Sequence, residues 1–151
     1  MKTTSIIALL CVFCAFLSCN GSHKGGERQL RADADSFVTA YFDWRFDKAL
    51  AWCTDSSAIW LRYAATQVHE ADIELLRAQK EGASHTIDEL TFINDSTALV
   101  AFSVNNFLAM DTIGKAARQV TEANYKLLMK YKNGRWLVSL KSLPQEEKTF
   151  H

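Results

Sequence analysis

The sequence predicts an α+β domain in which three N-terminal helices pack on a curved antiparallel sheet of about four strands. Apolar residues recur every three or four positions in the first half of the chain, which is the period of a helix face, and every second position beyond Gly82, which is the period of a strand. Between the last two alternating segments lies Asn133-Gly134, a pair typical of a tight β-hairpin turn. Consecutive strands joined by short turns are antiparallel, so one face of this sheet is left for the helices to cover.

The first 18 residues have the layout of a signal peptide. Lys2 supplies a positive charge, residues 6–17 are continuously apolar, and the small residue Ser18 directly precedes Cys19. The apolar run is shorter than the roughly 18 residues that a membrane-spanning helix needs, so we expect an exported protein without a transmembrane helix.

The end of this leader resembles the signal of bacterial lipoproteins, in which a small residue precedes a cysteine that is acylated and becomes the new N-terminus. The stretch Phe16-Leu17-Ser18-Cys19 carries the resemblance, although the usual pattern begins with leucine. The resemblance implies that Cys19 carries a lipid that anchors the protein in the bacterial cell envelope. Because Asn20 stands where an aspartate is associated with inner-membrane retention, we expect the outer membrane, with the domain facing the periplasm. An ordinary secretory peptide, cut near Ser18 or Ser22, is the alternative.

The chain after the leader divides into a tether, one domain and a tail. Residues 19–27 are mostly small, polar and glycine-rich, which is the composition of a flexible tether. We place the folded domain at residues 28–143 and a polar C-terminal tail at residues 144–151. This length is enough for one hydrophobic core, and no repeat points to a second domain.

The helical half is predicted to contain three helices. Residues 28–52 carry apolar side chains at spacings of three and four, which places them on one face of a first helix. Residues 54–57 interrupt this pattern and offer capping side chains for a second helix around residues 59–64. A third helix is expected from His69 or Glu70 to residue 81, where Gly82 would end it in the left-handed conformation.

The strand half alternates with period two. We expect strands at residues 86–93, 97–110, 120–131 and 135–143, joined by short turns. In the second of these strands one polar residue interrupts the face that we assign to the interior, which consists of Val100, Phe102, Val104, Asn106, Leu108 and Met110.

The order of these elements resembles the NTF2-like superfamily, in which a helical layer packs into the concavity of a bent antiparallel sheet and forms a cone. The resemblance rests on Phe37-Val38-Thr39-Ala40-Tyr41, on residues 46–50 followed by Thr54-Asp55, and on the closing stretch of residues 133–138. More closely, the chain resembles the small lipid-anchored NTF2-like proteins of unassigned function. The superfamily contains isomerases, dehydratases and polyketide cyclases as well as binding proteins, so its fold alone does not decide function. Dimerisation through the outer face of the sheet is common in this superfamily, so the resemblance also implies a homodimer as a candidate assembly.

Charge, cysteine and histidine usage argue against several classes of function. The chain has 17 basic and 17 acidic residues, interleaved throughout, so we do not expect nucleic acid as a partner. Once the leader is removed and Cys19 is lipidated, Cys53 is the remaining cysteine, and its apolar helical setting is typical of a packing residue. The four histidines show no short-spaced pairing with each other or with Cys53, so we expect neither a metal nor another cofactor.

The expected ligand site is the interior of the cone, between the first helix and the concave face of the sheet. We expect Asn106 to orient a ligand there, because a buried amide needs hydrogen-bond partners. Trp44, Tyr63 and Tyr125 are the candidate walls. We name no catalytic residue, since the acidic residues are better explained as helix caps and turn residues, and His85 as a solvated loop residue.

Two functions from different classes follow. The first is a non-catalytic, lipid-anchored envelope domain that binds a small hydrophobic ligand, a peptide or another envelope protein. The alternative is a small isomerase or dehydratase-like enzyme with its active site in the cone. A pair of ionisable groups facing one cavity would favour the enzyme, whereas a closed apolar core with an exposed aromatic patch would favour protein binding.

Overall fold

The structure is a computed structural model of the 151-residue chain and describes residues 25–110 and 114–148. Cys19, the predicted lipidation site, and the predicted signal peptide lie outside the described residues. In the part of the chain that the structure describes, no helix is long and apolar enough to cross a bilayer.

The first half of the chain forms the helical layer. From residue 25 onward it contains four α-helices and two short 3-10 helices, which are α1 (Gly26–Phe42), α2 (Phe46–Ala49), η1 (Leu50–Trp52), η2 (Asp55–Ser57), α3 (Ala58–Thr66) and α4 (Glu70–Ala78). The start of α4 is as predicted, because the backbone N–H of His69 donates to the carboxylate of Asp72 at 2.9 Å and closes a capping box. Its end is not, since α4 stops at Ala78 and the backbone of Gly82 is not left-handed.

The predicted first helix is broken at Trp44. Its backbone has φ 60°, a left-handed conformation that ends α1 at Phe42 and turns the chain into α2. Apolar residues keep their spacing of three and four across the break, so the pattern gave no sign of it. The turn is held by the N–H of Trp44, which donates to the carbonyl of Tyr41 at 3.1 Å, and by that of Arg45, which donates to Ala40 at 2.8 Å.

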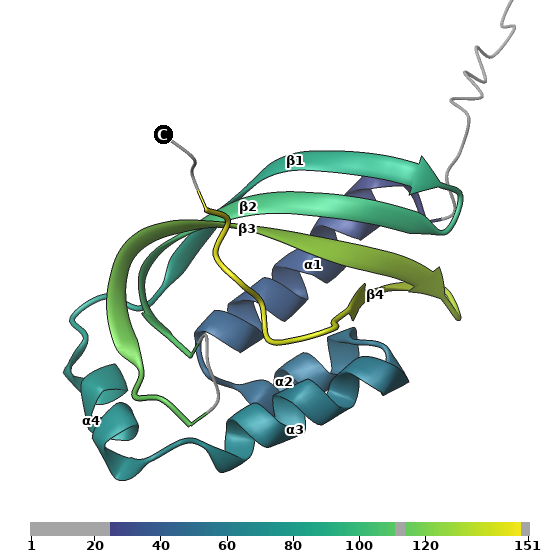
Figure 1. Cartoon of the computed structure of the whole chain (residues 1–151). Helices are drawn as coiled ribbons and strands as arrows, with labels where there is room; N and C mark the ends of the chain where they lie inside the picture. The colour runs from purple at the N-terminus through teal and green to yellow at the C-terminus, as the bar shows by residue number, and fades with distance from the viewer. Residues whose placement is uncertain (1–24, 111–113, 149–151) are drawn as a thin grey trace, which may run out of the picture.

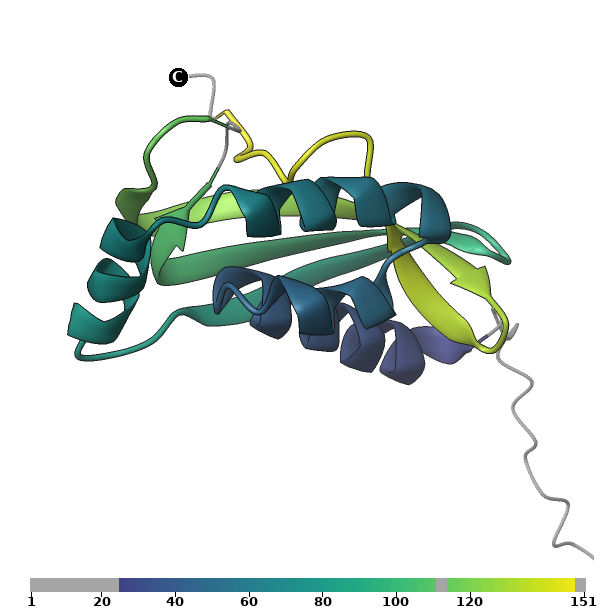
Figure 2. The same cartoon turned by 90° about the horizontal axis from the view of Figure 1, so that it is seen from below.

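The second half of the chain forms one antiparallel sheet, as predicted. Its strands are β1 (Ser84–Asn94), β2 (Thr97–Ala109), β3 (Arg118–Lys132) and β4 (Arg135–Ser139), in the order β1-β2-β3-β4. Asn133 and Gly134, with φ of 53° and 79°, form the tight hairpin between β3 and β4. The helices lie on one side of the curved sheet, which gives the α+β cone that the sequence predicts (Figures 1 and 2).

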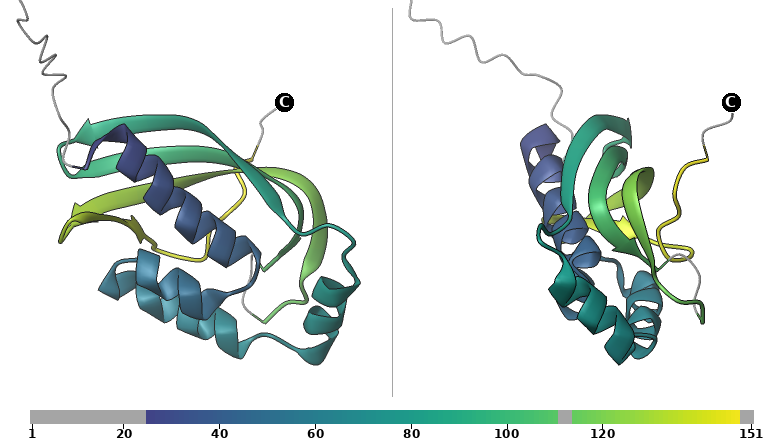
Figure 3. Two further views of the ribbon diagram at one scale, coloured as in Figure 1. Left: turned by 180° about the vertical axis from the view of Figure 1, so that it is seen from behind. Right: turned by 90° about the vertical axis from the view of Figure 1, so that its left-hand side faces the viewer.

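The alternation of β2 stops at Asn106, and this corrects the predicted register. Val104 and the even-numbered residues before it face the interior, but Asn106 has φ 53° and is exposed, and the next four residues, 107–110, are all buried. On β3 the buried positions shift in the same way, from Ala123 to Val120. A left-handed residue turns the following side chains to a new direction, so a strict period of two cannot continue through it. The C-terminal part of β2 and the N-terminal part of β3, which pair there, bend strongly toward α4 (Figure 3).

The core lies between α1 and the concave face of the sheet. Phe37 and Trp136 are fully buried, and Trp136 on β4 donates its backbone N–H to the carboxylate of Asp33 on α1 at 2.9 Å. The helical layer also contacts the residue directly after β4, since the buried hydroxyl of Ser57 accepts the N–H of Leu140 at 2.8 Å. These two hydrogen bonds fix the position of the helical layer against β4 and the residue that follows it.

Candidate functional site

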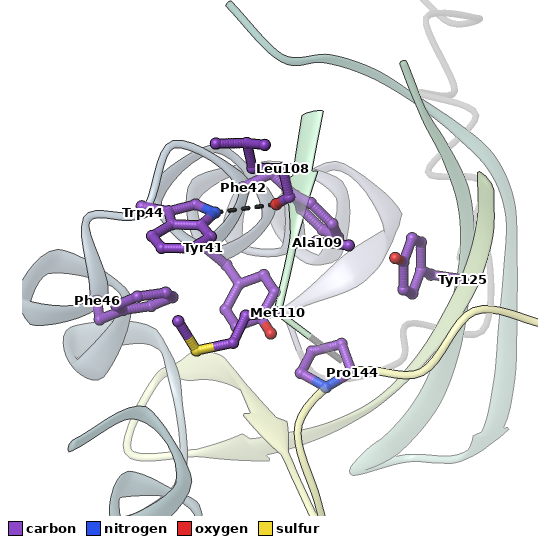
Figure 4. Close-up of a pocket in the computed structure, with 9 residues that line it drawn as sticks. All are labelled: Tyr41, Phe42, Trp44, Phe46, Leu108, Ala109, Met110, Tyr125 and Pro144. Atoms are coloured by element: carbon purple, nitrogen blue, oxygen red, sulfur yellow. Dashed lines mark hydrogen bonds between the residues drawn. The ribbon is translucent and has the colours of Figure 1, made fainter. Parts of the chain in front are cut away.

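The cavity at the end of the cone lies where α1, the Trp44 turn and the last residues of β2 meet, and we call it the cone-end cavity. Its volume is about 10 Å³, which is at the lower limit for a single water molecule. Figure 4 shows the aromatic side chains that gather around it. The described residues that line it are Tyr41, Phe42, Trp44, Phe46, Leu108, Ala109, Met110, Tyr125 and Pro144.

The left-handed backbone of Trp44 places its indole across the cavity. Its Nε1 donates to the carbonyl of Leu108 at 2.9 Å, and its ring lies 5.8 Å from that of Phe46, measured between centroids (Figure 4). Phe42 packs edge-on against Tyr125 with centroids 5.1 Å apart. Such edge-to-face contacts are favourable for aromatic pairs, so the rings fill this end of the cone and leave little space for a ligand.

Of the four predicted pocket residues, the structure brings two together. Trp44 and Tyr125 both line the cone-end cavity. Tyr63 lies instead on the outer face of α3 with 49% of its surface exposed. Asn106 is exposed as well and borders a shallow surface hollow with Gln79, Lys80, Glu81 and Gln119, so the predicted orienting amide does not face the interior.

The described lining of the cone-end cavity has little capacity for acid–base chemistry. It contains no carboxylate and no imidazole, and its ionisable groups are the phenols of Tyr41 and Tyr125. Among the described residues there is also no group of three or more His, Cys, Asp or Glu side chains that could hold a metal ion.

Cys53 is buried, as the sequence predicts, with 6% of its surface exposed. Its thiol lies 3.4 Å from the carbonyl of Leu50. Burial raises the pKa of the Cys53 thiol above its usual value, and the nearby negative charge of Asp55 acts in the same direction. A thiol that is held neutral in this way is a poor nucleophile, so the geometry favours a packing role.

A larger hollow, which sequence reasoning missed, lies between the C-terminal half of α1 and the start of β1. We call it the α1–β1 hollow; its volume is about 290 Å³. At its edge the Nε2 of His85 lies 2.6 Å from a carboxylate oxygen of Asp35. His85 belongs to β1 and only 16% of its side chain is exposed, so the prediction of a solvated loop residue is wrong.

One signal in the sequence could have pointed to this hollow. Asp35, Thr39 and Asp43 are spaced by four residues and therefore lie along one stripe of α1. The sequence did not show that β1 brings His85 to this stripe, because His85 and Asp35 are fifty residues apart.

Apolar side chains are also exposed on α3. Ile59 and Tyr63 lie one helical turn apart with 65% and 49% of their surfaces exposed. Arg62 is exposed between them. We call these three residues the α3 patch.

Comparison with known proteins supports the architecture. No model of a known protein family and no curated protein matches the chain. A ketosteroid isomerase-like protein from Erwinia carotovora atroseptica SCRI1043 matches it with a TM-score of 0.50 and 15% sequence identity, over 74% of this chain and 88% of that one. An NTF-2 like protein of unknown function from Shewanella oneidensis MR-1 matches 74% of this chain and 92% of its own, with 14% identity and a TM-score of 0.46. The chain has the NTF2-like fold.

The NTF2-like fold is compatible with ligand binding and with catalysis of the isomerase kind. Which of the two functions applies therefore depends on the side chains of the site and not on the fold. Among the described residues, aromatic rings fill the interior down to a cavity of about 10 Å³, whereas the α1–β1 hollow and the α3 patch are open to solvent.

Proposed function

We propose that this protein is a lipid-anchored domain of the bacterial cell envelope that binds another envelope protein through the α3 patch, without catalysis. The observation that carries the proposal is the combination of a filled cone with exposed aromatic and aliphatic side chains on α3. A cavity of about 10 Å³ is too small for an organic ligand, which typically occupies a pocket of at least about 300 Å³. Binding through the cone would therefore require several rings to move.

The α3 patch has the composition of a protein-binding surface. Tyr and Arg are enriched at the energetically important positions of interfaces, and Tyr63 and Arg62 are neighbours on α3. Ile59 adds apolar area one turn earlier, with 65% of its surface exposed. We expect a partner that offers an apolar surface for Ile59 and Tyr63 and a carboxylate for Arg62.

The predicted anchor restricts where this partner is found. Five residues, 20–24, lie between Cys19 and Gly25, where the described structure begins, and the six steps from Cys19 to Gly25 span at most about 20 Å. A lipid on Cys19 would hold the domain close to the membrane surface, within reach of other envelope proteins.

The anchor is tested by metabolic labelling with a radioactive fatty acid. We expect the wild-type protein to be labelled and Cys19→Ser to be unlabelled, because the thiol is the acylated group. Equal labelling of the two proteins would contradict lipidation at Cys19.

The binding surface is tested by placing the photo-reactive residue p-benzoylphenylalanine at position 59 in living cells. We expect one discrete adduct with an envelope protein, and we expect it to disappear when Arg62→Glu is added. The matched control is the same probe at Ile93, an aliphatic residue of β1 with 54% of its surface exposed, which should give no adduct. Adducts at both positions or at neither would overturn the proposal, and an adduct of twice the mass of the chain would identify a second copy as the partner.

A further inference from the structure

We propose that the edge of β3 at residues 122–126 pairs with the same edge of a second copy of this chain, and that the C-terminal residues 144–148 compete with the second copy for this edge. We call residues 122–126 the β3 edge and residues 144–148 the C-terminal segment. The α3 patch shares no residue with either of them, so this surface is separate from the one that we propose for an envelope protein.

The β3 edge is open because β4 is short. β4 pairs with residues 128–132 of β3, and its last residue, Ser139, lies opposite Leu128. On its other side β3 pairs with β2 along residues 118–130. Among the described strands, residues 118–127 of β3 therefore have a partner on one side only. A strand edge of this kind presents backbone N–H and C=O groups that can bind another strand.

The even-numbered residues of the β3 edge direct their backbone groups away from β2. The carbonyl of Asn124 accepts the backbone N–H of Glu147, which lies on the open side. Backbone groups of successive residues in a strand point to opposite sides, and the register between β2 and β3 is constant along this stretch. Glu122, Asn124 and Lys126 therefore present N–H and C=O groups on the open side, and their side chains are exposed.

The C-terminal segment, yellow in Figure 1, runs back across β3 and covers this edge. The N–H of Glu147 donates to the carbonyl of Asn124 at 2.8 Å, and the carboxylate of Glu147 lies 3.2 Å from the ammonium of Lys126. Glu146 pairs with Arg118, also at 3.2 Å. The side chains of both ion pairs are 41–52% exposed, so these pairs contribute little. Such a segment can be displaced by a strand that offers the same contacts.

A second β3 edge offers these contacts. Antiparallel pairing about a two-fold axis at Asn124 places Glu122 of each copy opposite Lys126 of the other. Lys126 then exchanges the carboxylate of Glu147 for that of the partner's Glu122. The carbonyl of Asn124 exchanges the N–H of Glu147 for that of the partner's Asn124. The charges of the β3 edge are thus complementary to themselves, which favours a second copy as the occupant. Because the paired stretch is short, we expect the association to be weak and to depend on concentration.

The competition is tested by releasing the C-terminal segment in residues 20–151, which contain every described residue but no lipid. Glu147→Pro removes the N–H that reaches Asn124, and Glu146→Lys places a like charge beside Arg118. In sedimentation equilibrium the double variant should dimerise with a dissociation constant at least about tenfold below that of the wild type. Glu147→Pro alone should act in the same direction by a smaller factor. Equal association of the wild type and the released variants, or none at the highest soluble concentration, would overturn the proposal.

A matched control separates release of the segment from the change in charge. Glu70→Lys with Glu74→Gln alters the net charge by the same amount as Glu146→Lys with Glu147→Pro, at exposed positions of α4. This control should associate no more than the wild type. If it dimerised as strongly as the released variant, the association would follow from net charge, and the role of the C-terminal segment would be refuted.

Charge reversal identifies the surface that pairs. In the released double variant, Glu122→Lys places two lysines opposite each other at both ends of the pairing and should raise the dissociation constant at least about tenfold. Adding Lys126→Glu restores opposite charges in the reversed order and should restore the dimer. A dimer that does not respond to Glu122→Lys, or that Lys126→Glu does not rescue, would be formed by another surface and would contradict the assignment.

Discussion

The cone-end cavity and the α1–β1 hollow share one side chain, Phe42, and differ in almost every other respect. On one side of Phe42 the rings of the cone are packed so closely that about 10 Å³ is left, and the described polar groups are phenols, an indole and backbone carbonyls. On the other side about 290 Å³ is open above the buried side chains of Val38 and Val104, with the carboxylate of Asp43 and the imidazole of His85 at its edge. Of these two regions, the one with more aromatic residues thus has less room for a ligand.

The difference shows what aromatic content means in a small domain. Large rings at helical and strand spacing bury apolar area and stabilise the fold, so a concentration of them indicates a filled core before it indicates a pocket. A ligand site needs space and polar groups that the fold does not use itself. Among the described residues such space is open at the edge of the sheet, where β1 pairs with β2 alone and faces the C-terminal half of α1.

The largest expected effect comes from the side chain that separates the two regions. Phe42 is 5% exposed, and its ring packs edge-on against those of Phe102, Phe107 and Tyr125 at centroid distances of 5.9, 5.1 and 5.1 Å. Phe42→Ala should lower the free energy of unfolding by about 3–5 kcal/mol, measured by urea denaturation, because it removes these contacts and leaves a cavity.

Thr39→Ala is the control for this measurement. Thr39 is exposed on the same helix and lines the open hollow, so its truncation should change the free energy of unfolding by no more than about 0.5 kcal/mol. If the two variants lost similar amounts of unfolding free energy, the contrast between a filled and an open region would be wrong.

Much of the fold could be predicted because its signals are local. The change from helical to strand period near Gly82 and the Asn133-Gly134 turn were enough for the order and pairing of the elements. The burial of Cys53 followed from its apolar neighbours in sequence. Each of these features is visible within a window of a few residues.

The misplaced parts of the site have two physical causes. Trp44 and Asn106 adopt left-handed backbone conformations that residues other than glycine rarely take, so composition gives no warning of the break in α1 or of the end of alternation in β2. The pairing of His85 with Asp35 depends on how an edge strand crosses a helix, which the spacing of residues within either segment does not encode. The ligand-binding roles predicted for Trp44 and Tyr125 stay predictions.

A smaller effect is expected at Asn106, where β2 turns toward the filled end of the cone. In the predicted register Asn106→Leu would remove a buried amide, and the free energy of unfolding would stay unchanged or increase. In the structure the side chain is exposed and φ is 53°, so the substitution should instead cost about 1 kcal/mol of unfolding free energy through backbone strain. Asn106→Gly should be neutral within a few tenths of a kcal/mol, since glycine accepts this conformation without strain.

The neighbouring residue provides the comparison for this pair of variants. Asn105 is partly exposed and has no positive φ, so Asn105→Leu should change stability less than Asn106→Leu does. Thermal unfolding of the four proteins, including the wild type, is sufficient. If Asn106→Leu melted above the wild type, the side chain would be gaining burial, and the bend would not be where the structure has it.

The last prediction concerns Cys53, where the expected change with pH is smaller still and reports on whether the packed part of the domain stays closed. Cys53→Ala should lower the free energy of unfolding by about 1 kcal/mol at pH 7, because a small apolar volume is lost.

Burial raises the pKa of the folded thiol above the usual value of 9.0, so below pH 9 the group is neutral in both states and its contribution is complete. As the pH rises above 9, the unfolded chain loses this proton first, and the stability that the neutral thiol contributes is lost until the folded thiol ionises as well. The difference between wild type and Cys53→Ala should therefore shrink between pH 7 and about pH 10, and comparing the two proteins cancels the titration of the lysines and tyrosines that they share. A difference that grows with pH would mean that the folded state favours the thiolate, in which case Cys53 would also react rapidly with a bulky maleimide in the native protein, and the core around Cys53 would be open where the structure has it closed.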